Sequence, residues 1–350
     1  MAVVFNDIYK GMNVMVTGAY GFKGTWLSFW LERLGANVTR YGHAPRLMAL
    51  NHHSLLGGAL VRGSDMLDYA MLEDAITTCR PEIIFHLAAK ALVIEGFQAP
   101  GKTFENNIMA AVNLMDICKK QPFIKGIVLI TTDKVYEDKN WIWGYRENDT
   151  LGGSDPYSAS KVAVEHAAAC YRKNFFPMIA VARAGNVIGG GDWSDYRLIP
   201  DMVKAAAVGH EVEINTPNAT RPWQHVLEPL SGYLMLGMKL LEGDEQYARE
   251  WNFGPTGEMT VLQVLEMAQQ SWNKIQYRVN EIERHKGMVN LLKIDSTLAH
   301  SELGWRNRWD QKLAIEKTIE WYRDYYTKGL VNTPDDIDQY EFMMKVGYAL

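Results

Sequence analysis

The chain has 350 residues, of which 47% are apolar and 22% charged, and its formal net charge at pH 7 is −5. This composition predicts a globular protein of one or two lobes and excludes a mainly disordered chain. Lysine and arginine are scattered rather than gathered in blocks, so nothing indicates binding to nucleic acid. No charge-free apolar run reaches the roughly 18 residues of a membrane span, and the N-terminus has no long apolar segment. We therefore expect a cytoplasmic protein with no membrane partner.

Three cysteines, Cys79, Cys118 and Cys170, lie far apart in the chain. Their spacing matches neither a zinc site nor a disulfide framework, so we expect them to be buried and reduced. The histidines form no cluster with them, and no metal site is predicted.

Short apolar runs alternate with longer helical stretches through the first half of the chain. In chain order we predict strand 13–16, helix 26–34, strand 37–41, helix 67–79, strand 83–86, helix 107–119, strand 126–130, helix 158–173 and strand 179–182. This alternation is typical of βαβ units, and the wholly apolar run 127–130 suits a sheet covered on both faces. The predicted fold is α/β, with a doubly wound parallel sheet.

The pattern becomes less regular after about Gly185, where a glycine triplet (189–191) and several aromatic loops follow. We assign residues 1–185 to a dinucleotide-binding lobe and residues 186–350 mainly to a smaller substrate-binding lobe. The run 251–253 predicts a strand that returns to the first lobe, within a segment near 226–254. The two lobes are therefore expected to be interleaved.

A glycine-rich turn follows the first predicted strand and opens the first helix, and it reads Gly18-Ala19-Tyr20-Gly21-Phe22-Lys23-Gly24. Glycines let the backbone turn sharply and approach a ligand, and the helix N-terminus offers free N–H groups to a pyrophosphate. A plain structural turn is the alternative, but the alternating pattern favours a dinucleotide site of the Rossmann type. The residues assigned to the cofactor here are Gly18, Tyr20, Gly21, Phe22 and Gly24.

A tyrosine and a lysine stand four positions apart in Tyr157-Ser158-Ala159-Ser160-Lys161. On a helix this spacing places both side chains on one face. A nearby positive charge favours the phenolate, so Lys161 is expected to lower the pKa of Tyr157 from about 10 and let it take a hydroxyl proton. The same spacing also fits a surface pair. The polar run 131–134 after a predicted strand favours catalysis, because ligands gather at the carboxyl ends of parallel strands.

The glycine turn, Thr132 and the Tyr157/Lys161 pair, in this order, resemble the extended short-chain dehydrogenase/reductase family. Within it, the chain is similar to the CDP-glucose 4,6-dehydratases over nearly its whole length. Further matches to the family are the runs 86–89 and 182–187 and Asn107. The motifs that carry the narrower likeness are 17–18 with 21–24, 132–134, 143–148, 189–193 and 221–229.

This resemblance implies an NAD-dependent nucleotide-sugar dehydratase, a lyase of deoxysugar biosynthesis. A hydride leaves the sugar C4 for NAD, water is lost across C5 and C6, and the hydride returns to C6. The resemblance implies that Tyr157 takes the C4 hydroxyl proton and that Thr132 hydrogen-bonds the C4 oxygen. Lys161 assists Tyr157.

Loss of water needs an acid on the departing C6 oxygen and a base on the C5 proton. The resemblance assigns Asp133 as the acid and Lys134 as the base, where dTDP-glucose dehydratases carry glutamate. A lysine acts as a base only if burial or its neighbours lower its pKa from about 10.4. The alternative is a loop ion pair between Asp133 and Lys134, with Thr132 as a cap at the strand end.

Substrate contacts are expected in both lobes. Arg221 and Asn186 match the residues that bind the two phosphates, and Arg197 is a further candidate. Lys90 and Tyr145 are also assigned to the substrate. The three aromatic residues Trp141, Trp143 and Tyr145 fit either a lid over the sugar or an anchor for their loop.

The residues alone do not decide whether the cofactor is NAD or NADP. The end of the second strand, 38–43, lacks the carboxylate that would bond a ribose 2′-hydroxyl, and Arg40, His43 or Arg46 would suit the 2′-phosphate of NADP. The resemblance favours NAD. The remaining residues assigned to the cofactor are Arg40, Asp65 at the adenine edge, Ala88, Asn107, Tyr157 and Lys161.

Two segments depart from the dehydratase pattern. Residues 90–97 lack the arginine, serine and tyrosine usual there, and residues 285–290 lack the usual His-Glu-Ala-His. Both fall where the family holds its substrate, so a CDP-hexose or a related nucleotide sugar is expected. The resemblance also implies a homodimer through the helices 107–119 and 158–173. Two alternatives remain, a nucleotide-sugar epimerase or reductase, and a non-catalytic dinucleotide-binding sensor or interaction module.

Overall fold

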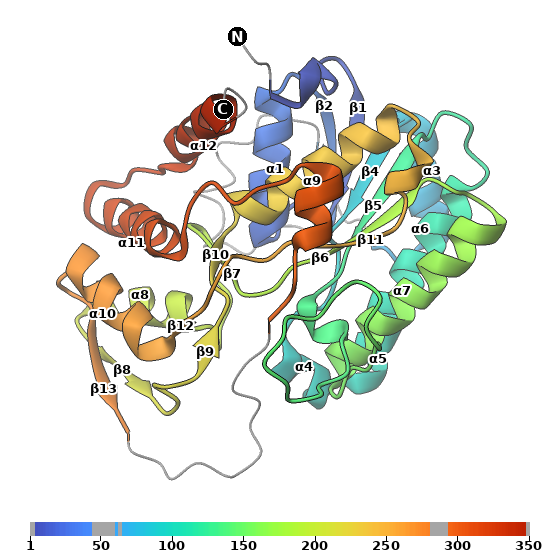
Figure 1. Cartoon of the computed structure of the whole chain (residues 1–350). Coiled ribbons are helices and arrows are strands. Elements are labelled where there is room, and N and C mark those ends of the chain that lie inside the picture. The colour runs from blue at the N-terminus through green and yellow to red at the C-terminus, as the bar shows by residue number, and fades with distance from the viewer. Residues whose placement is uncertain (1–3, 44–59, 62–64, 281–292, 348–350) are drawn as a thin grey trace.

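The computed structural model describes residues 4–43, 60–61, 65–280 and 293–347. Within these residues, seven strands form a central sheet in the order β11-β6-β5-β4-β1-β2-β3, and every neighbouring pair is parallel (Figure 1). The strands are β1 (Asn13–Thr17), β2 (Asn37–Tyr41), β3 (Leu60–Val61), β4 (Ile83–His86), β5 (Gly126–Ile130), β6 (Ile179–Arg183) and β11 (Glu250–Asn252). The prediction of a doubly wound parallel sheet is confirmed.

Helices cover both faces of this sheet because alternate side chains of each strand point to opposite faces. In β1, Val14 and Val16 join one apolar cluster, whereas Met15 between them joins the other. The first cluster contains α1 (Phe22–Arg33) and α9 (Leu227–Leu241); the second contains α3 (Tyr69–Cys79), α6 (Ala110–Cys118) and α7 (Pro156–Asn174). The wholly apolar strands are thus buried on both sides.

A second group of elements, which corresponds to the expected smaller lobe, shares the first apolar cluster with the sheet (Figure 1). These elements are β7 (Val187–Ile188), α8 (Leu198–Val208), β8 (Glu211–Ile214), β9 (Thr220–Arg221), β10 (Gln224–His225), β12 (Met259–Thr260), α10 (Val261–Ser271), β13 (Gln276–Val279) and α11 (Gln311–Lys328). None of the helices in the described ranges is long and apolar enough to cross a membrane. The last helix, α12 (Thr333–Gly347), returns to α1, where Glu341 accepts the indole N–H of Trp30 at 2.8 Å.

Most element bounds follow the sequence pattern, and the differences have local causes. Strands β2, β4 and β5 have the predicted bounds, and β1 and β6 are each one residue longer. The helix expected over 107–119 begins with a π-helical turn, Glu105–Met109, before α6. The short helices α4 (Val93–Gln98) and α5 (Pro100–Phe104) were not predicted, because segments of five or six residues carry too little periodicity. Strand β11 lies beside β6, with Trp251 opposite Ala182.

The cysteines do not share one environment. Cys118 is buried within α6, Cys79 is partly exposed and Cys170 is exposed. The expectation that all three are buried is therefore wrong for Cys170, which lies on the outward face of the amphipathic helix α7.

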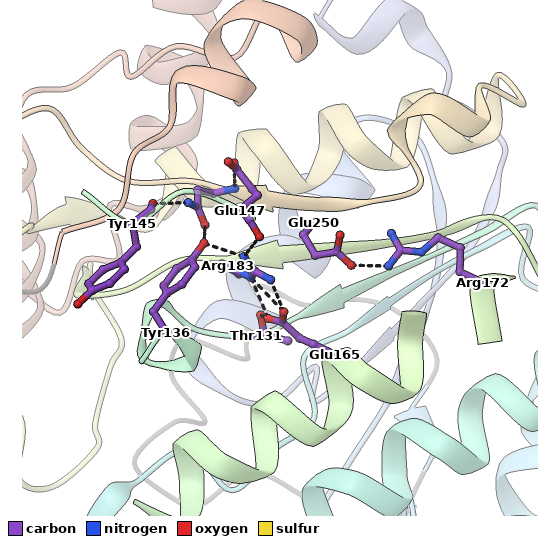
Figure 2. A network of polar contacts seen from close by, with 9 residues as sticks. Thr131, Tyr136, Tyr145, Glu147, Glu165, Arg172, Arg183 and Glu250 are labelled. Atoms are coloured by element: carbon purple, nitrogen blue, oxygen red, sulfur yellow. Dashed lines mark hydrogen bonds and ion pairs between the residues drawn. The ribbon is translucent and has the colours of Figure 1, made fainter. Parts of the chain in front are cut away.

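A buried ion pair joins β6 to α7. The side chains of Arg183 and Glu165 are each 2% exposed, and Arg183 Nε lies 3.1 Å from both carboxylate oxygens of Glu165. Thr131, directly after β5, donates its hydroxyl to the same carboxylate at 2.6 Å (Figure 2). Burial would lower the pKa of Arg183, but the hydrogen bonds and charge of Glu165 raise it above its ordinary value. Strand β6, helix α7 and the end of β5 therefore meet at this ion pair.

Arg183 also holds the segment that follows β5. Its Nη1 donates to the hydroxyl of Tyr136 at 2.7 Å and to the carbonyl oxygen of Glu147 at 3.0 Å. Tyr136 donates to Asn252 Oδ1 at 2.7 Å, and the carboxylate of Glu147 accepts the N–H of Asn252 at 2.8 Å. Figure 2 shows Tyr136, Glu147 and Glu165 gathered around Arg183. The loop 131–147 is therefore tied to β6 and to the returning strand β11.

We predict that Arg183→Met lowers the free energy of unfolding by about 3–5 kcal/mol, because it leaves the Glu165 carboxylate buried and unpaired. Urea unfolding followed by circular dichroism measures the change. Adding Glu165→Gln should recover part of the loss. The matched control is Arg278→Met, which removes an ion pair to Glu213 with both side chains more than half exposed and should change little. A loss for Arg183→Met no larger than that of this control would contradict the prediction.

Candidate active site

The glycine turn between β1 and α1 is shaped for close approach of a ligand. Gly18 has φ +67, and a Cβ there would lie 2.7 Å from the backbone nitrogen of Ala88. A Cβ on Gly24 would lie 2.2 Å from the carbonyl oxygen of Gly18. Gly21 is the N-cap of α1 and provides no side-chain hydrogen bond to the first turn. The helix N-terminus therefore keeps N–H groups for an anion, which fits the pyrophosphate of a dinucleotide.

The tyrosine and lysine of the predicted pair lie in the first turns of α7. Its N-cap residue Asp155 accepts the N–H of Ser158 at 3.0 Å, and Pro156 occupies the first helical position. Lys161 is 3% exposed, and its ammonium donates to the carbonyl oxygen of Ile130, the last residue of β5, at 2.9 Å. The pair is therefore brought to the carboxyl end of the sheet, as the sequence predicted.

The electrostatics of this pair differ from the expectation. Burial raises the pKa of Tyr157 to about 12, the Thr132 hydroxyl lowers it by hydrogen bonding, and the charge of Asp133 raises it. Burial and the charge of Lys23 lower the pKa of Lys161 to about 7. The prediction of a lowered pKa for Tyr157 is therefore wrong, because the effect of burial is larger, and the Lys161 ammonium is directed to a backbone carbonyl.

Thr132, Asp133 and Lys134 follow β5 in a single turn of 3-10 helix, Asp133–Val135. Thr132 donates its hydroxyl to Asp133 Oδ1 at 2.9 Å and accepts the N–H of Lys134 at 3.3 Å. Asp133 is 3% exposed, and a Cβ on Gly185 would lie 1.8 Å from its carboxylate, so only glycine fits there. Burial raises the pKa of Asp133, which favours the protonated form. Lys134 is exposed.

The candidate phosphate ligands border the same region. Arg221, in β9, is partly buried; burial lowers its pKa, and the charge of Asp133 raises it. Arg197 caps the start of α8 and lies 3.0 Å from the carboxylate of Asp192. Asn186 has a positive φ of 48 and lies in the turn between β6 and β7. All three belong to the face where the smaller lobe meets the sheet.

Three predicted contact residues have structural partners. Asn107 is 1% exposed, accepts the N–H of Lys90 at 2.8 Å, and donates to Ser160 Oγ at 2.8 Å, so it positions the loop after β4 against α7. Lys90 lies in that loop, and its side chain is partly exposed. Tyr145 is 2% exposed and stacks on Tyr136 with ring centroids 5.0 Å apart. Tyr145 therefore anchors its loop, and its assignment to the substrate is not supported, because its ring is enclosed.

Two of the residues expected at the adenosine end of the cofactor, Arg40 and Asp65, have partners within the protein. Arg40 is 1% exposed and forms an ion pair with Glu32, so its guanidinium is turned into the protein rather than toward a 2′-phosphate. The carboxylate of Asp65 accepts the N–H of Leu67 at 2.9 Å. Burial raises the pKa of Tyr20, against the charge of Arg40. Arg46 and the segment 288–290 lie outside the described residues.

Two residues that sequence reasoning left without a role also lie here. Lys23, inside the glycine turn, has its ammonium 6.0 Å from the ring centroid of Tyr233 on α9. A charged residue inside a glycine turn was the available signal for Lys23; nothing local marks Tyr233. In the described ranges, no group of three or more histidine, cysteine, aspartate and glutamate residues could hold a metal ion.

The parallel sheet, the glycine turn and the Tyr157/Lys161 pair define an extended short-chain dehydrogenase/reductase. The chain also matches the family model described as GDP-mannose 4,6 dehydratase over residues 15–318, and it belongs to that family. The resemblance inferred from the motifs is thereby confirmed.

The chain is similar to curated dehydratases over most of its length. It is 37% identical to a CDP-glucose 4,6-dehydratase of Salmonella typhimurium over 334 residues, which cover 92% of this chain and 93% of that protein. It is 27% identical to a dTDP-glucose 4,6-dehydratase of Streptomyces antibioticus over 330 residues, 89% of this chain and 93% of that protein.

Solved structures share the fold. A UDP-glucose 4-epimerase from Brucella ovis in complex with NAD superimposes with a TM-score of 0.79 at 22% identity, covering 89% of this chain and 98% of that one. A dTDP-glucose 4,6-dehydratase from Bacillus anthracis in complex with NAD gives a TM-score of 0.72 at 21% identity, covering 90% and 97%.

We predict that the stability of the protein rises with pH relative to a Lys161→Met variant. The folded pKa of Lys161 is about 7 against an ordinary 10.5, so between these values the unfolded chain binds more protons. The stability difference should therefore shift in favour of the wild type by about 1 kcal/mol per pH unit above pH 7. Urea midpoints at several pH values measure it. Lys125→Met, at a half-exposed lysine paired with Glu82, is the control and should run parallel to the wild type, whereas parallel curves for Lys161→Met would refute the prediction.

Proposed function

We propose that the protein is an NAD-dependent nucleotide-sugar 4,6-dehydratase that acts on a CDP-hexose and yields a 4-keto-6-deoxy sugar. The observation that carries this proposal is Asp133, which is 3% exposed and whose pKa is raised by burial. Burial makes the Asp133 carboxyl bind its proton more readily than an exposed one, so Asp133, fixed by the Thr132 hydroxyl, suits the donor of a proton to a departing sugar oxygen.

The first step concerns the sugar C4. Tyr157 takes the C4 hydroxyl proton and Thr132 holds the C4 oxygen, and the hydrogen bond from Thr132 already lowers the pKa of Tyr157. Because burial raises the pKa of Tyr157 to about 12, formation of the phenolate needs further positive charge or hydrogen-bond donors at its oxygen. NAD, when bound, accepts the hydride from C4 and later returns it to C6. Lys161, whose amine donates to the carbonyl oxygen of Ile130, lies about one helical turn from Tyr157 on α7.

The second step removes water. A ketone at C4 makes the C5 proton acidic, so a base can remove it while Asp133 protonates the C6 oxygen. The resemblance assigns the base to Lys134, which follows Asp133 on the same helical turn and whose side chain is exposed. The rigid turn supports the role of Asp133, because Gly185 and Thr132 fix its carboxylate.

The same elements suit the two ligands. The first turn of α1, with Gly18, Gly21 and Gly24, would hold the NAD pyrophosphate, and the Glu32–Arg40 pair disfavours a 2′-phosphate at this strand end. On the other side, Arg221 and Asn186 would bind the diphosphate of the nucleotide sugar, because a guanidinium and an amide both donate to phosphate oxygens. Arg197 is a further candidate once it exchanges Asp192 for substrate.

We also propose a homodimer. Helices α5, α6 and α7 lie together on one side of the sheet (Figure 1), and apolar side chains of α4, of α5 and of the π-helical turn before α6 remain exposed. Phe97, Phe104 and Met109 are 64%, 37% and 42% exposed. Exposed apolar side chains gathered on one helical layer mark a surface that a second copy can cover.

We predict that purified protein with NAD releases water from CDP-glucose when it is given CDP-, dTDP-, UDP- and GDP-hexoses. Mass spectrometry detects a product lighter by one water. Loss of water from another nucleotide sugar of this panel would support the same reaction, but on a substrate with a different nucleotide. No loss from any member, with NAD bound, would refute the dehydratase.

Asp133→Asn separates the dehydratase from its relatives in the same assay. Asparagine keeps the shape of the side chain but cannot donate a carboxylic proton, so water loss should fall by about 100-fold or more. Hydride transfer at C4, followed by absorbance of the reduced cofactor in a single turnover, should persist. Equal loss of both would favour a structural role for Asp133.

The dimer is tested by placing charge on its proposed face. Phe104→Glu combined with Met109→Glu should convert a dimer to a monomer, because two carboxylates would be buried without partners. Sedimentation velocity measures the mass. Phe342→Glu, at a 66% exposed position on α12, is the control and should leave the dimer intact. A wild-type protein that sediments as a monomer would overturn the proposal.

A further inference from the structure

The ladder between β6 and β11 ends beside the candidate active site. The two strands end at Arg183 and Asn252, and the N–H of Phe253 still donates to the carbonyl oxygen of Arg183 at 2.9 Å. The chain after β6 then turns into β7 of the smaller lobe, so its next carbonyl groups leave the ladder. A buried carbonyl oxygen at such a place needs a donor from elsewhere, because burial without a hydrogen bond costs free energy.

Gln224 of β10 supplies this donor. It is 1% exposed, and its side-chain amide nitrogen donates to the carbonyl oxygen of Gly185 at 3.1 Å and to that of Phe253 at 2.8 Å. Both partners can only accept hydrogen bonds, so the nitrogen of the amide, rather than its oxygen, must face them. One side chain therefore joins the two chain segments that continue from the ends of β6 and β11.

The backbone of Gln224 holds the residue after Gly185. Its N–H donates to the carbonyl oxygen of Asn186 at 3.2 Å, and β10 pairs in parallel with β7, with Gln224 opposite Val187. Asn186 is one candidate ligand of the substrate diphosphate, and Arg221, the other main candidate, lies three positions before Gln224. Gln224 is therefore bonded to Gly185 and to Asn186 by separate groups.

Gly185 forms a wall against which the Asp133 carboxylate packs. A Cβ on Gly185 would lie 1.8 Å from Asp133 Oδ2 and 2.3 Å from Oδ1. The hydroxyl of Thr132 donates to Oδ1 at 2.9 Å. Because the carboxylate and the Gly185 backbone are already in close contact, a shift of Gly185 would change the place that the carboxyl group occupies.

We propose that Gln224 is a positioning residue of the elimination, which acts through Gly185 to fix the Asp133 carboxyl relative to the residues that bind the diphosphate. This inference rests on the proposed dehydratase function. Transfer of the Asp133 proton to the departing C6 oxygen depends on the placement of the two groups, and a displacement of about 1 Å can cost about 100-fold in rate. Hydride transfer from C4 depends instead on Tyr157 and the cofactor, which belong to α7 and the turn before α1.

The test compares Gln224→Met, Gly185→Ala and the variant with both substitutions. Methionine keeps the length of the glutamine side chain but has no N–H donor, and the methyl group of Gly185→Ala displaces the Asp133 carboxyl directly. Each protein is given NAD and CDP-glucose, or the panel member that the wild type dehydrates. Absorbance of the reduced cofactor in a single turnover measures hydride transfer from C4, and mass spectrometry measures loss of water.

In both single variants, water loss should be slower by about 10- to 100-fold, whereas hydride transfer should stay near the wild-type rate. Because Gln224 acts through Gly185, the variant with both substitutions should lose water at the rate of Gly185→Ala alone. The matched control is Gln311→Met. Gln311 is 7% exposed and its amide atoms have no hydrogen-bond partner among the described residues, so this substitution should change neither rate.

Three results would each overturn the proposal: water loss at the wild-type rate in Gln224→Met, an equal fall of hydride transfer and water loss in that variant, or effects of the two substitutions that multiply when they are combined. Circular dichroism and NAD binding establish that each variant is folded, and Gln224→Leu replaces Gln224→Met if the latter fails to fold. A wild type that dehydrates no panel member overturns the proposed function and this inference together. Any of the three results with an active wild type overturns only the role of Gln224.

Discussion

The buried pair of Arg183 and Glu165 is the constraint on which the site depends. Two opposite charges out of water are tolerated only when they face each other and their remaining hydrogen-bonding groups are filled. Here Thr131 and Tyr136 fill them, at 2.6 and 2.7 Å. The need to satisfy one guanidinium therefore sets the positions of the end of β5, of helix α7 and of the loop after β5. These are the elements that carry Thr132, Asp133 and Tyr157.

The site itself forms where the two lobes share one apolar cluster. Small residues permit close packing: Gly18 lets the turn after β1 pack on the loop after β4, Gly24 lets α1 pack on that turn, and Gly185 leaves space for a carboxylate. Each of these contacts would be prevented by a single methyl group. The same closeness removes water from the charged side chains, which explains why burial is the first cause of the pKa shifts of Asp133, Tyr157 and Lys161.

Charged side chains from separate elements act on one another at this site. The charge of Lys23 lowers the pKa of Lys161, and the charge of Arg197 lowers that of Lys23. Burial raises the pKa of the Asp133 carboxyl and lowers that of both amines. This arrangement results from the packing of α1, α7 and α8 around the turn after β5. These elements are far apart in the chain.

The sequence by itself determined the class of fold, because strand and helix periodicities and the steric needs of glycine are local properties. It also determined the chemistry available in Thr132, Asp133, Tyr157 and Lys161, whose spacing follows from one strand end and one helix. The burial and the charge environment of these side chains could not be predicted from the sequence, because they depend on elements that are distant in the chain. Tertiary packing alone enclosed Tyr145, paired Arg40 with Glu32, and left Lys134 exposed while surrounding Lys23 with charge. A side chain's protonation depends on what surrounds it in space, which its neighbours in the sequence do not reveal.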